Sequence, residues 1–350
     1  MQTHDDILEL VRQQGAEAAR KMQRGLIVQP GAIGDCILTL PLAAYMKESL
    51  DLGGIDILGH TEYIGFLPGR SCVDSIRSID SIDIHRLFAD TNRFVLKDED
   101  PLITAFRDYG WIVTFLGEPN SNFEQNLIFT ANCSHSAEVI TLSMKPPKGF
   151  SEHLADYYIR QFIDQSGFSL QRQTIQTNDC LIKATEADIN TGKELLREIG
   201  LGIGEKLMVI QPGSGGTKKC WHLENFLAVA KELDLRGVEI IFLLGPAEME
   251  RYSDAMIKNI GSVGKCLSDL SLTQVLGLLS CVDRFIGNDS GITHLAAALG
   301  VRTYSIYGPT DPEVYKSIGP DVTVFASKIA SFAKRPSMRL QRKFLEVVTA

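Results

Sequence analysis

The chain carries a short internal repeat that constrains its fold more than any other feature. Residues 29–34 read Q-P-G-A-I-G and residues 211–216 read Q-P-G-S-G-G, so the two copies stand about half the chain length apart. Each copy closes an apolar run typical of a buried strand and precedes a helical pattern. Glycine-rich turns between a strand and a helix are typical of Rossmann-like domains. The repeat therefore predicts two such domains in one chain.

Apolar segments of strand length alternate with helical patterns through both halves of the 350 residues. This alternation favours an α/β fold with parallel, doubly wound sheets, and the length suits two domains better than one core. A helix is also expected over residues 151–166, with Ser151 as its N-cap. The expected strands cover residues 25–29, 55–58, 111–115, 207–211, 238–244, 284–286 and 303–307.

Four segments follow from these patterns. Residues 1–24 are predicted to form an N-terminal helical extension, and residues 326–350 a basic C-terminal helix or tail. Between them lie a first Rossmann-like domain at 25–170 and a second at 180–325. Ligands of open parallel sheets bind beyond the carboxyl ends of the strands, so two such edges facing each other would build a cleft.

Charge and composition exclude several classes of protein. The formal net charge of −8 argues against a nucleic-acid partner, and the 44% of apolar residues is ordinary for a globular chain. The chain lacks a run of about 18 uncharged apolar residues, so no membrane-spanning segment is expected. Seven cysteines without a C-x-x-C pair, and an N-terminus without a secretory signal, predict reduced thiols in a cytoplasmic protein.

The first motif that could carry chemistry is G-A-I-G-D-C-I-L-T-L-P at residues 31–41. Its glycines allow a sharp turn close to a ligand, and Asp35 falls in the first turn of the helix that follows. A carboxylate there can simply stabilise the positive end of the helix. Because the flanking residues are apolar, Asp35 is also a candidate general base at the mouth of a cleft.

The second motif is P-G-S-G-G-T-K-K-C-W at residues 212–221. Successive small residues, including Ser214 and Gly215, expose backbone N–H groups, and Lys218 and Lys219 follow. This combination indicates an anion-binding nest with a fixed counter-charge. It matches neither the Walker A loop nor G-x-G-x-x-G. The alternative is an ordinary polar, solvated loop.

The third motif is G-N-D-S-G-I-T-H-L-A-A-A-L-G at residues 287–300. Asp289 and Ser290 precede a helix that starts near Gly291, where free N–H groups and the helix dipole favour phosphate. His294 lies one turn inside and could donate to an anion, although a lone helical histidine is commonly structural. Glu248, which follows another strand, could bind ribose hydroxyls.

Together these segments resemble glycosyltransferase family 9, the ADP-heptose:lipopolysaccharide heptosyltransferases. The similarity runs from about residue 25 to 320 and includes A-I-G-D-C-I-L-T-L-P, the loop at 212–221, L-L-G-P-A-E, the N-D-S-G-x-x-H segment and Y-G-P-T-D-P. The resemblance implies a GT-B fold, with the acceptor bound mainly by the first Rossmann-like domain and the nucleotide-sugar by the second.

The resemblance also implies roles for individual residues. Asp35 matches the family's proposed catalytic base, and Lys219 would stabilise the departing nucleoside diphosphate. The residues matched to donor binding are Ser214, Gly215, Lys219, Glu248, Leu270, Asp289, Ser290, Gly291 and His294. Many family members carry Ser or Thr where Gly215 stands. The implied reaction is an inverting glycosyl transfer, with heptose from ADP-heptose as the expected donor sugar.

Several partners and alternatives follow. Metal-ligand spacing is absent from the His, Cys, Asp and Glu residues, so we expect neither a metal nor a cofactor. The acceptor would be a lipopolysaccharide-type glycan or glycolipid. The segment 328–350 holds six basic residues and one acid, which indicates either a solvated helix or peripheral docking on an anionic membrane.

Other functions fit parts of the pattern. A glycosyltransferase with another nucleotide-sugar and a non-catalytic nucleotide-sugar-binding protein stay open. A nucleotide-sugar epimerase would not need A-I-G-D, and a nicotinamide dehydrogenase would need the missing G-x-G-x-x-G.

Overall fold

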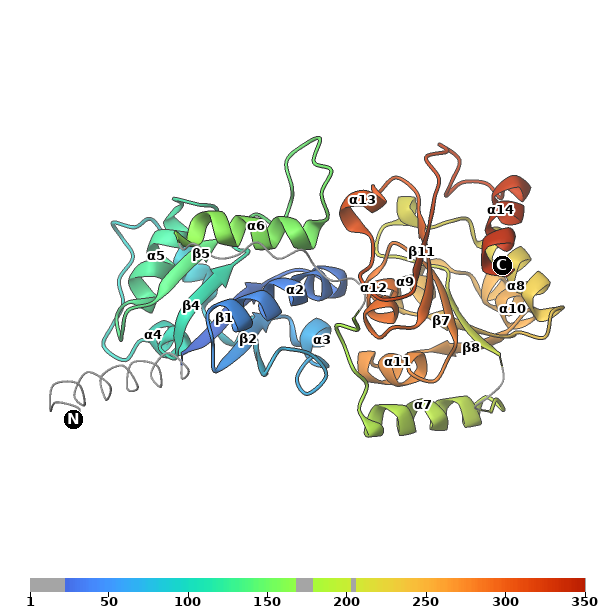
Figure 1. Cartoon of the computed structure of the whole chain (residues 1–350), viewed down its shortest axis with the longest axis horizontal. Coiled ribbons are helices and arrows are strands. Elements are labelled where there is room, and N and C mark those ends of the chain that lie inside the picture. Colours follow the sequence, from blue (N-terminus) through green and yellow to red (C-terminus); the bar gives the residue numbers. More distant parts are fainter. Residues whose placement is uncertain (1–22, 168–178, 203–205, 350) are drawn as a thin grey trace, which may run out of the picture. The chain divides into compact units, whose positions relative to one another are not determined.

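The computed structural model describes residues 23–167, 179–202 and 206–349 (Figure 1). The helical extension expected at 1–24 lies outside the described residues except for its last two. The junction expected between residues 170 and 180 also lies almost wholly outside them.

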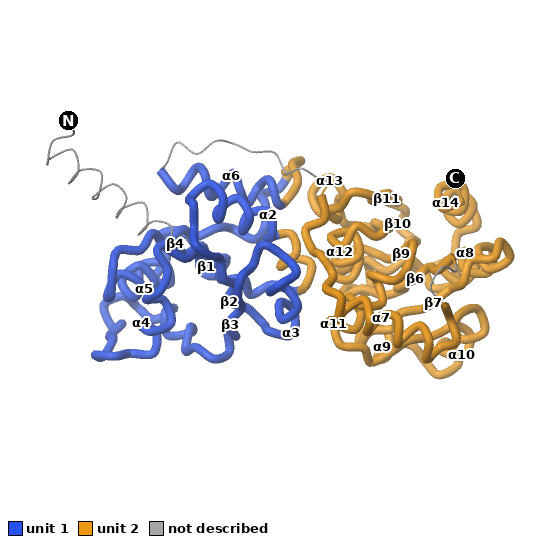
Figure 2. The backbone as a smooth tube through the Cα atoms, turned by 60° about the horizontal axis from the view of Figure 1, so that its bottom comes forward, with its two compact units in different colours: residues 1–32, 39–148, 155–175 blue, residues 33–38, 149–154, 176–350 orange. Residues whose placement is uncertain are grey.

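The described chain divides into two compact units (Figure 2). One unit is drawn from residues 1–32, 39–148 and 155–175, and the other from residues 33–38, 149–154 and 176–350. Each unit is built around a sheet of its own, and both sheets are parallel throughout.

The first sheet has the strand order β3-β2-β1-β4-β5. Its strands are β1 (Arg24–Gln29), β2 (Gly54–Gly59), β3 (Ser75–Ser78), β4 (Tyr109–Thr114) and β5 (Glu138–Thr141). The accompanying helices are α2 (Ile33–Ser49), α3 (Thr61–Ile64), α4 (Pro101–Phe106), α5 (Asn122–Ala131) and α6 (Leu154–Ser166), with 3₁₀ turns at Ile79–Ser81 and Ile84–Phe88. The first strand in sequence, β1, lies in the middle of this sheet and is covered on both faces, because Leu26, Ile27 and Val28 have no exposed surface.

The second sheet has the order β11-β10-β9-β6-β7-β8, and helices flank it on both sides (Figure 1). Its strands are β6 (Leu207–Gln211), β7 (Glu239–Leu244), β8 (Lys265–Ser268), β9 (Arg284–Asn288), β10 (Arg302–Tyr307) and β11 (Val322–Ala326). Its longer helices are α7 (Glu186–Glu198), α8 (Leu223–Asp234), α10 (Asp254–Gly261), α11 (Leu272–Leu279), α12 (Gly291–Ala298) and α14 (Met338–Thr349). Three short elements complete it: a 3₁₀ turn at Thr217–Lys219, α9 (Pro246–Arg251) and α13 (Pro312–Tyr315).

The strands expected from sequence are present, within one or two residues at most of their ends. The four short outer strands β3, β5, β8 and β11 were not expected. The expectation of a helix from Ser151 is wrong in its start, because α6 begins at Leu154. The apolar stripe that packs this helix begins only there, with Leu154 and Ala155 both buried.

The last helix, α14, belongs to the core of the second unit. Leu340, Phe344 and Val348 on one face of α14 are buried in the cluster around Trp221. The Phe344 ring meets the Trp221 ring edge-on, with 5.5 Å between centroids. The segment expected at 326–350 is therefore helical only from Met338, since Ala326 ends β11. Its helix α14 is amphipathic and packs on the protein, with Arg339, Arg342 and Lys343 on the exposed face. Within the described residues, no helix is both long enough and apolar enough to cross a membrane.

Helices α7 and α11 approach each other through two glycines. A side chain at Gly192 would collide with the carbonyl oxygen of Gly277, and one at Gly277 would meet the carbonyl of Asp188 at 2.5 Å. Only hydrogen at both positions permits this backbone contact, so the outer layer of the second unit depends on that pair.

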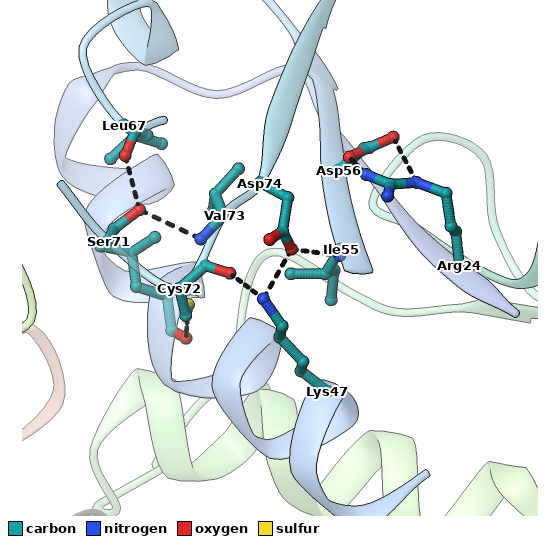
Figure 3. A network of polar contacts seen from close by, with 10 residues as sticks. Arg24, Lys47, Ile55, Asp56, Leu67, Ser71, Cys72, Val73 and Asp74 are labelled. Atoms are coloured by element: carbon teal, nitrogen blue, oxygen red, sulfur yellow. Dashed lines mark hydrogen bonds and ion pairs between the residues drawn. The ribbon is translucent and has the colours of Figure 1, made fainter. Parts of the chain in front are cut away.

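A polar network ties the amino-terminal half of the first unit together (Figure 3). Lys47, in the last turn of α2, donates to Asp74 Oδ2 at 2.7 Å, and Ile55 N–H of β2 donates to the same oxygen at 2.8 Å. Burial alone would raise the pKa of Asp74, but these two donors lower it. Arg24 pairs with Asp56, whose second hydrogen-bond donor is the Tyr109 hydroxyl at 2.8 Å.

A second ion pair in the first unit yields a stability prediction. Asp100 accepts two hydrogen bonds of 2.9 Å from the Arg86 guanidinium and caps α4 through Leu102 N–H. Its side chain is 4% exposed, and the pairing with Arg86 lowers its pKa to about 2. We expect Asp100→Ala to lower the free energy of unfolding by about 2 kcal/mol, through the lost cap and the unpaired guanidinium.

Urea unfolding near neutral pH measures this loss. Because the folded pKa of Asp100 is depressed, its contribution is present above about pH 4 and is lost as the pH falls towards 2. Asp108→Ala is the control, since Asp108 is 70% exposed and lies 3.7 Å from Arg107. Equal losses in the two variants would contradict the prediction.

Candidate anion-binding site at the switch point of the second sheet

The candidate site lies where the strand order of the second sheet reverses. From the centre of the sheet, β6, β7 and β8 follow one another towards one edge, and β9, β10 and β11 follow one another towards the other edge. The loops that leave the carboxyl ends of β6 and β9 therefore diverge and leave room for a ligand. These two loops are the second and third motifs of the sequence, and the structure brings them together.

One buried amide holds the loop after β6 in place. Asn288, the last residue of β9, has no exposed surface. Its Nδ2 donates to the carbonyl oxygens of Pro212 and Gly213, at 2.8 and 3.2 Å, and its Oδ1 accepts from Trp221 N–H at 2.7 Å. The amide thus contacts both ends of the segment 212–221, and its single side chain sets the path of this loop.

Ser214 fastens the middle of the loop to the next residue of the third motif. Its hydroxyl donates to the Asp289 carbonyl at 2.7 Å, and the side chain is buried. The hydroxyl proton is therefore used inside the protein. Gly215 and Gly216 are exposed, and within the described part of the chain neither N–H donates a hydrogen bond. These two amides are donors available to a ligand.

A charged cluster lies beside these amides. Lys219 Nζ is 2.7 Å from Asp289 Oδ2, and His294 Nε2 is 3.8 Å from Asp289 Oδ1. Burial alone would raise the pKa of Asp289, but the neighbouring His294 and Lys219 outweigh it and hold the pKa at about 2. The carboxylate is thus ionised at every physiological pH. Lys219 is 42% exposed and stays within reach of an anion.

The N-terminus of α12 completes this edge. Ser290 is the N-cap: its Oγ accepts from Thr293 N–H at 3.3 Å and donates to Gln211 Oε1 at 2.9 Å. Gln211 belongs to the second Q-P-G copy. In the first copy, the buried Gln29 accepts from Gly31 N–H at 2.9 Å and donates to Thr39 Oγ1 at 2.8 Å. The repeated glutamine therefore ties a strand end to a helix in both units.

Glu248 lies in α9, the short helix that follows β7, and packs against Gly213 of the loop. It is 2% exposed, and its Oε2 accepts from Gly245 N–H at 2.8 Å, while the buried Oε1 has no partner. Burial raises the pKa of this carboxyl. A side chain at position 213 would collide with Oε1, so Gly213 is required for this packing. An unpartnered buried acceptor of this kind suits a ligand hydroxyl.

The remaining predicted residues lie at strand ends as well. Leu270 is half-buried in the loop between β8 and α11. Gly291 is the first residue of α12. Asp35 lies in the first turn of α2, after the carboxyl end of β1, and is half-buried.

Sequence reasoning missed three residues that shape the site. Asn288 and Gln211 appeared in quoted motifs but received no role, and Arg251 was not considered. Arg251 donates to the carbonyls of Ser214 and Gly215. The available sequence signal for Arg251 was its position three residues after Glu248, on the helix that follows β7. Across the described ranges, no group of three or more His, Cys, Asp and Glu side chains is arranged to hold a metal ion.

Fold and site define a two-unit α/β protein with a glycine-rich loop at the switch point of its second sheet, where two exposed amides and Lys219 are available to an anion. A family model described as glycosyltransferase family 9 (heptosyltransferase) matches residues 133–343, which is more than half of the chain. The chain therefore belongs to glycosyltransferase family 9.

Curated relatives agree with this family. Lipopolysaccharide heptosyltransferase 3 of Escherichia coli is 30% identical over 142 residues, which cover 38% of this chain and 41% of the relative. The chain spans about half the length of the curated relatives it matches.

Solved structures are similar over nearly the whole chain. The glycosyl transferase family 9 protein of Veillonella parvula DSM 2008 superposes with a TM-score of 0.69 at 18% identity, covering 93% of this chain and 96% of that one. The E. coli heptosyltransferase WaaC with ADP gives a TM-score of 0.64 at 17% identity, covering 93% and 99%. The predicted fold class, a GT-B fold of two Rossmann-like domains, is confirmed.

The buried Glu248 carboxylate yields a pH-dependent prediction. Because burial raises its folded pKa, ionisation of Glu248 destabilises the fold as the pH rises from about 4.5. We expect Glu248→Gln to have a higher urea midpoint than the wild-type protein at pH 7.5, with a smaller difference at pH 4.5. Glu250→Gln, an exposed change on the same helix, is the control. A wild-type protein that is equally or more stable at pH 7.5 would count against a destabilising effect of the buried Glu248 carboxylate.

Proposed function

We propose that the protein is an inverting, metal-independent glycosyltransferase that moves heptose from ADP-heptose onto a lipopolysaccharide-type acceptor. The observation that carries the proposal is the pair of free amides at Gly215 and Gly216 on a loop that also carries Lys219 and packs against the unpartnered Glu248 Oε1. This arrangement fits the two halves of a nucleoside diphosphate, an anion and a vicinal diol. Family membership and the heptosyltransferase relatives support the same donor.

The donor would lie along the carboxyl edge of the second sheet. Glu248 accepts from the ribose hydroxyls, and the half-buried Leu270 at the end of β8 contacts the base. The diphosphate contacts the amides of Gly215 and Gly216, the N-terminus of α12 and Lys219. Ser214, whose proton is used on the Asp289 carbonyl, shapes the loop and does not donate to phosphate.

The leaving group gains negative charge as its bond to the anomeric carbon breaks. Lys219 and the preorganised amides are placed to stabilise this charge, which is the role a divalent cation has in other transferases. His294, 3.8 Å from Asp289, holds that carboxylate from the side opposite Lys219. Side chains and backbone amides of the protein itself would therefore stabilise the negative charge that develops on the leaving group.

The acceptor oxygen needs a base. We assign this role to Asp35, at the carboxyl end of β1 in the first turn of α2. The acceptor O–H transfers its proton to the Asp35 carboxylate while the oxygen attacks the anomeric carbon and the C–O bond to the diphosphate breaks. Attack opposite the leaving group inverts the anomeric centre, through a transition state with oxocarbenium character.

The test of the donor is a panel of ADP-, UDP- and GDP-sugars, with and without a lipopolysaccharide core acceptor. We expect acceptor-dependent release of ADP from ADP-heptose and no comparable release from the others. Release from another nucleotide-sugar would reassign the donor. Tight binding without turnover of any donor would indicate a non-catalytic nucleotide-sugar-binding protein.

Replacement of Asp35 tests the catalytic assignment. General-base help is worth roughly 10²–10⁴-fold, so Asp35→Ala should lower kcat by at least about 10²-fold. The Kd for ADP should stay within about two-fold, because Asp35 contacts the acceptor and not the nucleotide. Glu48→Gln, an exposed change near the other end of α2, should leave both unchanged. A turnover close to wild type in Asp35→Ala would remove the residue from this role.

We also propose that the protein meets the membrane through α14. Arg339, Arg342 and Lys343 lie on α14, and Lys328, Lys334 and Arg335 lie on the segment that leads into it. All six are exposed, and Glu346 is the single acid between residues 328 and 350. The apolar face of α14 is buried in the core, so its contribution to binding is electrostatic. Anionic lipid headgroups attract each such cation by about 1 kcal/mol near the surface.

Charge reversal on α14 tests this contact. Arg339→Glu with Arg342→Glu should weaken binding to vesicles with 30% phosphatidylglycerol by at least about ten-fold at low salt. Arg93→Glu with Arg197→Glu is the matched control, since it changes the net charge equally at exposed positions, one in the first unit and one on α7, which packs against α11. Equal weakening in the two double variants, or no binding by the wild type, would refute docking through this helix.

A further inference from the structure

We infer that Arg251 is a positioning residue that fixes the anion-binding amides of the donor site. The inference rests on the proposed function, in that the anion is the diphosphate of the donor. Arg251 is the last residue of α9, one turn after Glu248. It has the fixed charge and the planar fork needed to hold two acceptors at once.

The guanidinium spans two consecutive carbonyls of the loop. Nη1 donates to the Ser214 oxygen at 2.7 Å, and Nη2 donates to the Gly215 oxygen at 2.8 Å. Asn288 already holds the carbonyls of Pro212 and Gly213. Four successive carbonyls of the segment 212–215 are therefore each bound by a side chain from outside the loop.

The orientation of a carbonyl determines that of the next amide. In a trans peptide the C=O of one residue and the N–H of the following residue point in opposite directions. With the Ser214 and Gly215 oxygens turned to Arg251, the N–H groups of Gly215 and Gly216 are directed away from it. These are the two amides that donate to nothing in the described residues. Arg251 thus keeps both donors aligned toward a common ligand.

The loop itself cannot supply this order. Gly215 and Gly216 are exposed, and glycine has the largest conformational freedom of any residue. Besides Arg251, the Ser214 oxygen is contacted by Cys220 Sγ at 3.9 Å, a weak donor at long range. Without the guanidinium, each amide would have to be ordered at the moment of binding, which costs affinity.

A cavity beside the Arg251 side chain makes a chemical-rescue experiment practical. It measures about 260 Å³ and is lined by Arg251, Cys220, Tyr252, Met256 and Ala333 among others. A free guanidinium ion is much smaller than this space. When Arg251 is replaced by Ala, a guanidinium ion can enter and occupy the position of the missing guanidinium group.

The experiment compares the wild type, Arg251→Ala, Arg251→Lys and the exposed-site control Arg236→Ala. Calorimetry measures the Kd of ADP, of inorganic pyrophosphate and of adenosine for each. We expect Arg251→Ala to raise the Kd of ADP and of pyrophosphate by about ten-fold, which corresponds to the loss of one or more aligned hydrogen bonds. Adenosine should bind unchanged, because it does not contact the amides. Arg251→Lys should recover only part of the loss, since an ammonium does not match the two carbonyls as a fork does.

Millimolar guanidinium chloride should restore ADP and pyrophosphate binding to Arg251→Ala and leave the wild type and Arg236→Ala unchanged. If Arg251 had a global structural role, Arg251→Ala would weaken adenosine binding as well, and guanidinium would not restore binding; that result would overturn the inference. An unchanged Kd for pyrophosphate in Arg251→Ala would also overturn it. If Arg251→Ala does not fold, the ratio of pyrophosphate to adenosine affinity in Arg251→Lys decides in the same way. Pyrophosphate binding that depends on Arg251, in a protein that turns over no nucleotide-sugar, would retain the inference and refute the proposed function.

Discussion

The geometry of the candidate site depends on one fully buried amide. Asn288 stands at the end of β9, where the strand order of the second sheet reverses, and contacts both ends of the loop that leaves β6. Because its three hydrogen bonds are out of reach of water, the loop has one path over the sheet edge. The placement of Ser214 on the Asp289 carbonyl and of Lys219 on the Asp289 carboxylate follows from that path.

Most polar groups of this edge are satisfied inside the protein, and the exceptions are informative. Within the described residues, the unpartnered buried atoms include Glu248 Oε1 and His294 Nδ1, both in the predicted donor site. The free amides of Gly215 and Gly216 lie on the loop that contacts Asp289 through Ser214 and Glu248 through Gly213. Trp221 Nε1 at the end of the same loop is also unpartnered, so unpaired buried polar groups gather at this edge of the sheet.

Much of the fold was predictable, because central strands are continuous apolar runs that end in Q-P-G or G-N-D. The outer strands β3 and β8 read S-I-R-S and K-C-L-S, and such short, half-exposed segments lack that signal. Site residues on strand ends, such as Asp289 and Glu248, were predicted from their motifs. Arg251 and Asn288 were missed because their role is to bind backbone carbonyls, and a sequence motif does not show which side of a loop faces a side chain.

The ion pair between Asp289 and Lys219 has a consequence for selectivity. In the absence of a ligand the lysine already has an anionic partner at 2.7 Å, and that carboxylate, with a pKa of about 2, is never neutralised under cellular conditions. Any incoming anion must compete with this built-in carboxylate for the same ammonium. Under the proposed function, a diphosphate would bring more charge than a singly charged ion such as chloride, and it would also accept hydrogen bonds from the amides of Gly215 and Gly216. The Asp289 carboxylate would then act as a selectivity element, because it disfavours small singly charged anions relative to a ligand that can displace it from Lys219.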